Sequence, residues 1–304
     1  MKTFVILVIA LSLRVACNAQ EFNVFHLAIG SAHYEQINIV EGHEPFDDIN
    51  GARRSARYVH ELFTQNANGQ GGMLRSEAGK PLTKSQILQE LNKLIEMAKT
   101  SGVNNPLLLF YYCGHGISEG IAWNQFLVPG DFNKKPNNLS TDPLALDLEI
   151  LRSELLYVGE VTDLLTDSGF PYMCLIDACY EGKEERFSVL ENFLGPVALQ
   201  NIKDIAAILR FMNKFHSQNP VIFATAPGTT TKVVPDPLLP EGSAWIGPIC
   251  RKLMLLRKPL KTSGTLSLAD VVMLLADSEF DEKTSHIITN YEIGENGFKT
   301  LLRY

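Results

Sequence analysis

The stretch that decides the fold is Pro106-Leu107-Leu108-Leu109-Phe110-Tyr111-Tyr112, which leads into Cys113-Gly114-His115-Gly116. Its six consecutive apolar and aromatic residues predict a strand covered on both faces, as the central strands of parallel sheets are. Shorter apolar runs predict the remaining strands, which we expect over residues 24–29, 71–74, 172–176, 221–226 and 286–289.

Helical patterns lie between these runs. Apolar residues recur at helical spacing over 50–63, and Thr83-Lys84-Ser85-Gln86 has the form of a capping box before an apolar face that extends to Ala98. Further helices are predicted over 161–168, 185–216 and 267–275. Strands that alternate with helices predict an α/β fold, with a mostly parallel central sheet and helices on both faces.

Composition narrows the class of protein. The chain has 304 residues, of which 45% are hydrophobic and 20% charged, and this excludes a disordered or collagen-like protein. A net charge of -7 argues against a surface that binds nucleic acid, because neutralising phosphates takes clustered Lys and Arg. Five cysteines without a Cys-x-x-Cys pair exclude a disulfide-stapled scaffold and argue against a zinc module.

The first residues have the pattern of a secretory signal peptide. Lys2 precedes the apolar run Phe4–Leu13, and small residues lead to Ala19. The run is too short for a transmembrane helix, which needs roughly 20 apolar residues. We therefore predict a signal peptide over 1–19, one domain over 20–304, no membrane span, and a protein exported to the periplasm or secreted.

Two predicted strands lead into residues with reactive side chains. One ends before His115, and the other, 172–176, ends before Asp177-Ala178-Cys179. Because ligands of parallel sheets bind at the carboxyl ends of the strands, the imidazole and the thiol could face each other there. The imidazole would then act as a base toward the thiol, and the backbone amides of Gly116 and Cys179 would stabilise an oxyanion.

Four segments of the chain resemble the caspase-fold cysteine peptidases, in particular the metacaspase and bacterial caspase-like branch. They are Tyr111–Gly116, Leu127–Asp131, Ile176–Cys179 with Gly182, and Phe223–Gly228. The resemblance implies a caspase-like three-layer sandwich and an endopeptidase that acts on proteins or peptides through a thioester acyl-enzyme, without a cofactor. It also implies that His115 is the general base, Cys179 the nucleophile, and Gly116 with Cys179 the donors to the oxyanion.

The resemblance also assigns three residues to the substrate pocket. In this branch the acid two residues before the nucleophile lines a pocket for Arg or Lys, and Asp177 matches it. A second pocket acid usually lies in the first helix, where this chain has Ser55, and Cys113 replaces the serine common two residues before the histidine. With one carboxylate in place of two, we expect a reduced preference for basic side chains.

Several alternatives remain open at this level. Gly116-Ile117-Ser118-Glu119-Gly120 fits the Gly-x-Ser-x-Gly pattern of serine esterases, with Ser118 as nucleophile and His286 as a late base. A caspase-like interaction protein without activity is a second alternative. Some metacaspases bind calcium, and Asp47, Asp48 and Asp131 are the carboxylates that such a site would use.

Overall fold

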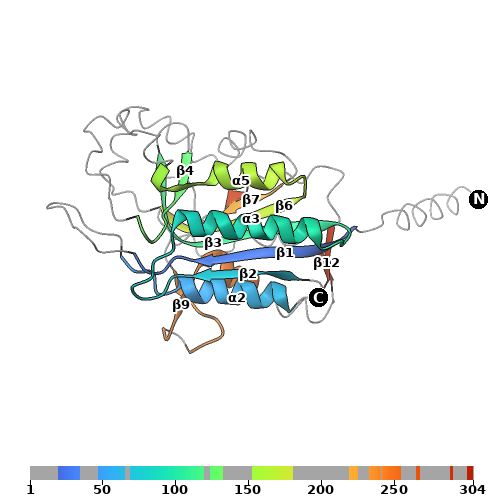
Figure 1. Cartoon of the computed structure of the whole chain (residues 1–304). Helices are drawn as coiled ribbons and strands as arrows, with labels where there is room; N and C mark the ends of the chain where they lie inside the picture. The colour runs from blue at the N-terminus through green and yellow to red at the C-terminus, as the bar shows by residue number, and fades with distance from the viewer. Residues whose placement is uncertain are drawn as a thin grey trace, which may run out of the picture.

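The computed structural model describes residues 20–34, 47–65, 69–119, 124–132, 153–180, 219–224, 233–240, 242–254, 265–267, 288–289 and 300–303. In these residues the strands form one large sheet and a separate two-stranded ribbon, β8–β9 (Figure 1). The strands are β1 (Gln20–Gly30), β2 (Gln70–Arg75), β3 (Pro106–Glu119), β4 (Asn124–Leu127), β5 (Leu156–Tyr157), β6 (Tyr172–Tyr180), β7 (Val221–Phe223), β8 (Val234–Pro235), β9 (Trp245–Ile246), β10 (Thr265–Ser267), β11 (Ile288–Thr289) and β12 (Thr300–Arg303).

The centre of the large sheet is parallel. Strands β2, β1, β3, β6 and β7 follow one another in this order, and each pairs in parallel with its neighbour. Antiparallel strands are added around this centre: β4 pairs with the end of β3, and β11 pairs with β7. A second group lies at the start of β1, where β12 pairs in parallel and β10 pairs antiparallel with β12.

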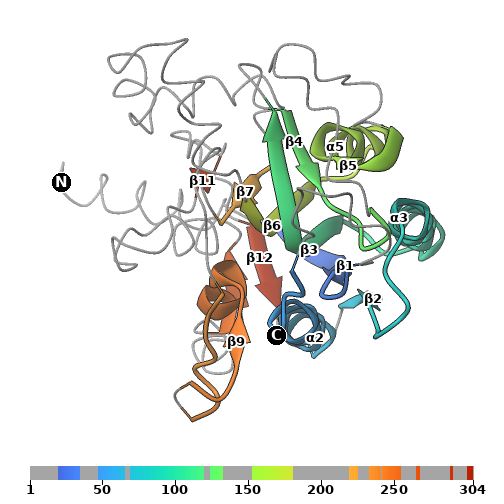
Figure 2. The same cartoon turned by 90° about the vertical axis from the view of Figure 1, so that its left-hand side faces the viewer.

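Helices cover both faces of the sheet. Helix α2 (Ala52–Thr64) packs on one face, together with helical residues 248–254, and helices α3 (Lys84–Thr100) and α5 (Val158–Asp167) pack on the other (Figure 2). Alternate residues of β3 divide between the two cores: Leu109 and Tyr111 pack toward α2, and Phe110 and Tyr112 pack toward α3 and α5. None of the described helices is both long and apolar enough to cross a membrane.

Most of the predicted elements are confirmed where the structure describes them. The strands predicted over 24–29, 71–74, 107–112 and 172–176 are β1, β2, β3 and β6, and the helix predicted over 50–63 is α2. The capping box is present, since the Gln86 amide donates to the Thr83 hydroxyl and the Thr83 amide donates to the Gln86 side chain.

Other predictions differ from the structure or lie outside its described part. Ser267, predicted to begin a helix, is the last residue of β10, and the rest of that helix falls on undescribed residues, as does the helix predicted over 185–216. Strands β3 and β6 are longer than predicted, because they remain paired with each other up to Gly116 and Tyr180. His115 and Cys179 therefore lie within the paired ends of two strands, not after them.

Candidate active site

His115 and Cys179 are direct partners in the sheet. The parallel register of β3 and β6 runs from Leu108 opposite Tyr172 to His115 opposite Cys179. Neighbouring strands lie roughly 4.8 Å apart, so the backbones of these two residues are adjacent. The structure thus brings together two residues that are far apart in the chain, at the carboxyl ends of the two central strands.

The His115 ring is held from the side of Nε2. His115 is only 2% exposed, and its Nε2 lies 2.7 Å from the backbone oxygen of Asp47. A carbonyl oxygen can only accept a hydrogen bond, so this contact places the proton of the neutral ring on Nε2. The lone pair then resides on Nδ1, which is the nitrogen that can take up a proton.

Tyr34 supports the same histidine in two ways. Its ring lies against the imidazole, with a centroid distance of 4.7 Å, and its hydroxyl accepts a hydrogen bond from the His115 amide at 2.8 Å. The hydroxyl in turn donates to the Ser31 carbonyl at 3.0 Å. Burial raises the pKa of Tyr34 well above the ordinary value, so the phenol stays neutral and can serve as donor and acceptor at once.

Gly114, the residue before His115, has no room for a side chain because the Tyr112 side chain lies too close. A methyl group on Gly114 would lie 2.5 Å from the hydroxyl of Tyr112, which donates to the Val128 carbonyl at 2.7 Å. The Val128 amide donates to the His115 carbonyl at 3.0 Å. The chain around the histidine is thus bonded to the segment that follows β4, and Gly116 continues this contact as the partner of Leu127.

Asp177 is a buried carboxylate with three hydrogen-bond donors. It is 3% exposed, and it accepts bonds from the Ile249 amide at 2.9 Å, the Cys250 amide at 2.9 Å and the Tyr111 hydroxyl at 2.8 Å. The two amides belong to the first turn of the helical residues 248–254. Burial raises the pKa of Asp177 to about 6, although the three hydrogen bonds oppose the rise.

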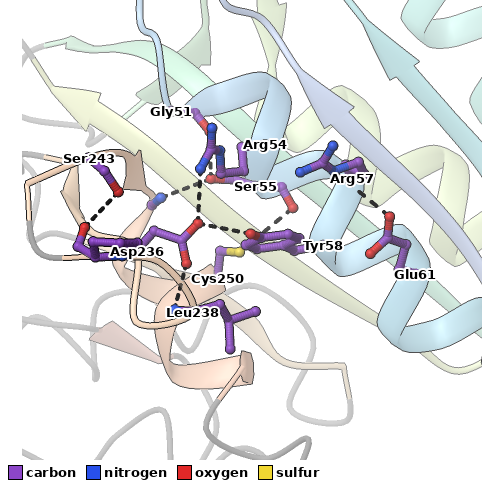
Figure 3. A network of polar contacts seen from close by, with 12 residues as sticks. Gly51, Arg54, Ser55, Arg57, Tyr58, Glu61, Asp236, Leu238, Ser243 and Cys250 are labelled. Atoms are coloured by element: carbon purple, nitrogen blue, oxygen red, sulfur yellow. Dashed lines mark hydrogen bonds and ion pairs between the residues drawn. The ribbon is translucent and has the colours of Figure 1, made fainter.

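Ser55 holds the same segment from the other side. The Gly247 amide donates to the Ser55 hydroxyl at 2.9 Å, and the Cys250 thiol lies 3.7 Å from the Ser55 carbonyl, to which it donates (Figure 3). A methyl group on Gly247 would lie 2.3 Å from an oxygen of Asp177, so there is no room for a side chain there. Ser55 and Asp177 therefore both form hydrogen bonds to the same short segment, residues 247–250.

Cys113 lies on the same face of the sheet. It is the register partner of Asp177 and is buried in the core that α2 covers. The three residues that the sequence assigned to a substrate pocket, Asp177, Ser55 and Cys113, thus gather in one region beside the pair His115 and Cys179.

The β8–β9 ribbon is anchored to the same helix. Asp236 is buried, and one of its oxygens accepts from the Tyr58 hydroxyl at 2.9 Å and from the Arg54 guanidinium at 3.2 Å. Its other oxygen accepts from the Leu238 amide at 2.9 Å. Figure 3 shows how these side chains of α2 reach the ribbon, which leads directly into the segment held by Ser55 and Asp177.

The family model described as the caspase domain matches residues 27–270, which is most of the chain. The chain belongs to the caspase domain family. The resemblance seen in the four sequence segments is thereby confirmed, and the family is in general one of cysteine peptidases. No curated protein matches the chain.

Two solved structures that are similar to this caspase-domain chain share little sequence identity with it. One is a protein from Geobacter sulfurreducens, with 11% identity, a TM-score of 0.48, and coverage of 93% of this chain and 100% of that one. Another is caspase-1 from Spodoptera frugiperda, with 11% identity, a TM-score of 0.43, and coverage of 94% of this chain and 92% of that one.

In this caspase-domain chain, the described residues around Ser118 do not form the nucleophile elbow that the esterase alternative needs. Ser118 lies within β3, paired with Gln125 of β4 in an antiparallel ladder. A nucleophile elbow needs a sharp turn from a strand into a helix, and no such turn follows Ser118 in the described residues. His286, the base of that alternative, lies outside the described residues.

The carboxylates suggested for calcium do not form a cage where the structure describes them. Asp48 uses both oxygens on other groups, since it bonds His33 Nδ1 at 2.7 Å and accepts from the Tyr34 amide at 3.1 Å. Among the described residues, no group of three or more His, Cys, Asp or Glu side chains is arranged to hold a metal ion. Calcium binding stays a prediction.

Sequence reasoning missed Tyr34 and the Asp47 carbonyl, the two groups that hold His115. A backbone carbonyl has no sequence signature, because every residue carries one. Tyr34 stands in a stretch without a motif, and only its position after β1 connects it to the histidine. Tyr111, the third donor to Asp177, fits the apolar pattern of the central strand, and nothing in that pattern indicates that its hydroxyl has a carboxylate partner.

Proposed function

We propose that the chain is a cysteine endopeptidase in which Cys179 is the nucleophile and His115 the general base. The observation that carries the proposal is the register of β3 and β6, in which these two residues are partners at the carboxyl edge of the sheet. Membership of the caspase domain family adds the class of chemistry.

In the proposed reaction, Nδ1 of His115 takes the proton of the Cys179 thiol, and the thiolate attacks the carbonyl carbon of the scissile peptide bond. The carbonyl oxygen becomes an oxyanion, stabilised by the backbone amides of Gly116 and Cys179. The C–N bond then breaks as the imidazolium protonates the leaving amine, and a thioester remains. Water, deprotonated by His115, hydrolyses the thioester and frees the thiol.

The hydrogen bond from Nε2 to the Asp47 carbonyl supports both halves of this cycle. It selects the tautomer that leaves Nδ1 able to accept a proton. The same bond stabilises the imidazolium that forms, because a cationic N–H is a stronger donor than a neutral one. No carboxylate is required behind the histidine for this purpose.

We further propose a weak preference for Arg or Lys before the cleaved bond. Asp177 provides one carboxylate, but its oxygens already accept three hydrogen bonds and Ser55 stands where a second carboxylate is usual. A basic side chain would have to compete with these internal donors. A peptide library should therefore show modest enrichment of Arg and Lys, and strong selection for acidic side chains would contradict the assignment.

A thiol-reactive peptide probe tests the proposed nucleophile. Burial raises the pKa of Cys174 and Cys250, so these thiols stay protonated and unreactive. We expect labelling at Cys179 in the native protein and a loss of about 100-fold in His115→Ala, since imidazole activation contributes roughly 10²–10⁴-fold.

Two variants serve as matched controls for this test. Ser118→Ala and His286→Ala remove the residues of the esterase alternative and should leave both labelling and peptide cleavage at native levels. Cleavage that survives Cys179→Ala but not Ser118→Ala would refute the cysteine mechanism. A chain that labels Cys179 no faster than its buried thiols would instead be an interaction protein without activity.

We propose, finally, that residues 1–19 direct export and are removed. The test is the N-terminus of the protein recovered outside the cytoplasm, which should begin at Gln20. Recovery of the chain with Met1 intact, inside the cell, would refute the proposal.

A further inference from the structure

We propose that Asp48 is a positioning residue for His115, because it fixes the backbone of the preceding residue, whose carbonyl accepts the hydrogen bond from Nε2. The inference rests on the proposed function of His115 and adds a residue that the sequence motifs do not contain. It does not make Asp48 a catalytic residue, since its side chain bonds His33 and Tyr34 and not the imidazole.

The carboxylate of Asp48 forms hydrogen bonds to two consecutive residues, His33 and Tyr34. One oxygen lies 2.7 Å from Nδ1 of His33, and the other accepts from the Tyr34 amide at 3.1 Å. The segment gains a third bond at the next residue, where the Ile49 amide donates to the Ala32 carbonyl at 2.9 Å. Residues 47–49 are therefore attached to 32–34 through three bonds.

The residues that Asp48 grips are themselves fixed to the sheet. The hydroxyl of Ser76 accepts from the Ala32 amide at 2.7 Å and from the His33 amide at 3.0 Å. The Ser31 amide donates to the carbonyl of Cys113, two residues before His115, at 2.9 Å. Asp48 therefore connects the Asp47 carbonyl, through residues 31–34, to β3, the strand that contains His115.

Both groups that contact the His115 imidazole, the Asp47 carbonyl and the Tyr34 ring, are connected to Asp48. One is the Asp47 carbonyl at 2.7 Å from Nε2, which belongs to the adjacent residue. The other is Tyr34, whose ring packs on the imidazole and whose amide bonds the Asp48 carboxylate. Removal of one carboxylate would loosen both contacts, although neither partner of His115 would itself be changed.

Because Asp48 and His33 are partly exposed, their contact should matter more for the position of His115 than for the stability of the fold. The side chains of His33 and Asp48 are 26% and 44% exposed, and ion pairs at such sites contribute little to the free energy of unfolding. A catalytic histidine is far more sensitive to position, since a misplacement of about 1 Å can lower the rate about 100-fold. Loss of Asp48 should therefore lower turnover without unfolding the protein.

The experiment compares Asp48→Ala, Asp48→Asn and Glu96→Ala in the full chain. Glu96 forms an exposed ion pair with Lys99 on α3 and controls for the loss of a surface carboxylate. We expect kcat to fall at least about 10-fold in Asp48→Ala with KM within about twofold, and to recover to within about threefold of native in Asp48→Asn, whose amide oxygen can still accept from the Tyr34 amide. All three unfolding midpoints should stay near that of the native protein.

Nitrogen-15 NMR of the His115 ring provides a readout that does not depend on activity. The native ring should be the tautomer with the proton on Nε2, and Asp48→Ala should show a mixture of tautomers. A native kcat in Asp48→Ala, or a fall in kcat matched by an equal fall in Glu96→Ala, would overturn the inference. A shift of tautomer in a protein that never cleaves peptides would uphold the positioning role and refute the proposed function instead.

Discussion

Asp177 allows a quantitative prediction, because its carboxylate is buried and its pKa is displaced upward. The perturbation is Asp177→Asn, which keeps the shape of the side chain and removes its titration. Burial raises the pKa of Asp177 from 3.8 to about 6 in the folded protein. Folding therefore favours the protonated form of this group, which is the opposite of an acid stabilised by a cation.

The sign and size follow from linkage. A folded-state pKa above the unfolded value gives a stabilisation that is complete below about pH 4 and is lost as the pH rises through about 6. The rise from 3.8 to about 6 corresponds to about 3 kcal/mol, at about 1.4 kcal/mol per pH unit. Between pH 7.5 and pH 4, the native residue should thus gain about 2–3 kcal/mol relative to Asp177→Asn.

Urea unfolding at several pH values measures this difference. The comparison is made in a Cys179→Ala background, which lacks the proposed nucleophile, with Glu96→Gln as a control that loses an exposed carboxylate. The difference between Asp177 and Asp177→Asn should widen in favour of the native residue as the pH falls, and Glu96→Gln should show no such change. A flat difference, or one that widens in favour of the variant, would refute the account of Asp177 as a desolvated carboxylate.

Three further predictions concern packing, anchoring and redox chemistry. Gly114→Ala should destabilise the protein by about 2 kcal/mol in thermal unfolding, because its methyl group meets the Tyr112 hydroxyl, whereas Gly72→Ala, whose methyl group has ordinary contact distance, should cost no more than about 1 kcal/mol. Asp236→Ala should cost about 3 kcal/mol and Tyr58→Phe about half as much in urea unfolding, since the first removes three hydrogen bonds and the second one; equal costs would contradict this network. Peptidase activity should decline during incubation in air and persist in thiol reductant, and equal activity in both would speak against an exposed catalytic thiolate.

The parallel centre of the fold could be predicted because its strands are buried on both faces. Strands β3 and β6 carry unbroken apolar runs, and the run in β1 is interrupted only by His26; such runs have few other interpretations when helical patterns separate them. The pairing of His115 with Cys179 followed from the same logic, since the ends of parallel strands meet at one edge. The register of β3 and β6 runs without a break from Leu108 opposite Tyr172 to Gly116 opposite Tyr180, and this carries the pairing through to His115 and Cys179.

The short antiparallel strands β4 and β5 could not be predicted from apolar runs. Strand β4 is four residues long and β5 two, too short for a periodic pattern to emerge. The contacts of Asp177 were equally hidden, because they depend on backbone amides of Ile249 and Cys250 that approach only in the folded chain. Sequence identifies a carboxylate near the nucleophile, but it does not say whether the donors to that carboxylate come from a substrate or from the protein.

The two acids that flank the proposed dyad differ in what they hold, and this difference is testable. Asp177 is buried two residues before Cys179 and caps the segment that follows the β8–β9 ribbon, so its loss should appear first in the free energy of unfolding. Asp48 is exposed and holds the residue whose carbonyl bonds His115, so its loss should appear in turnover.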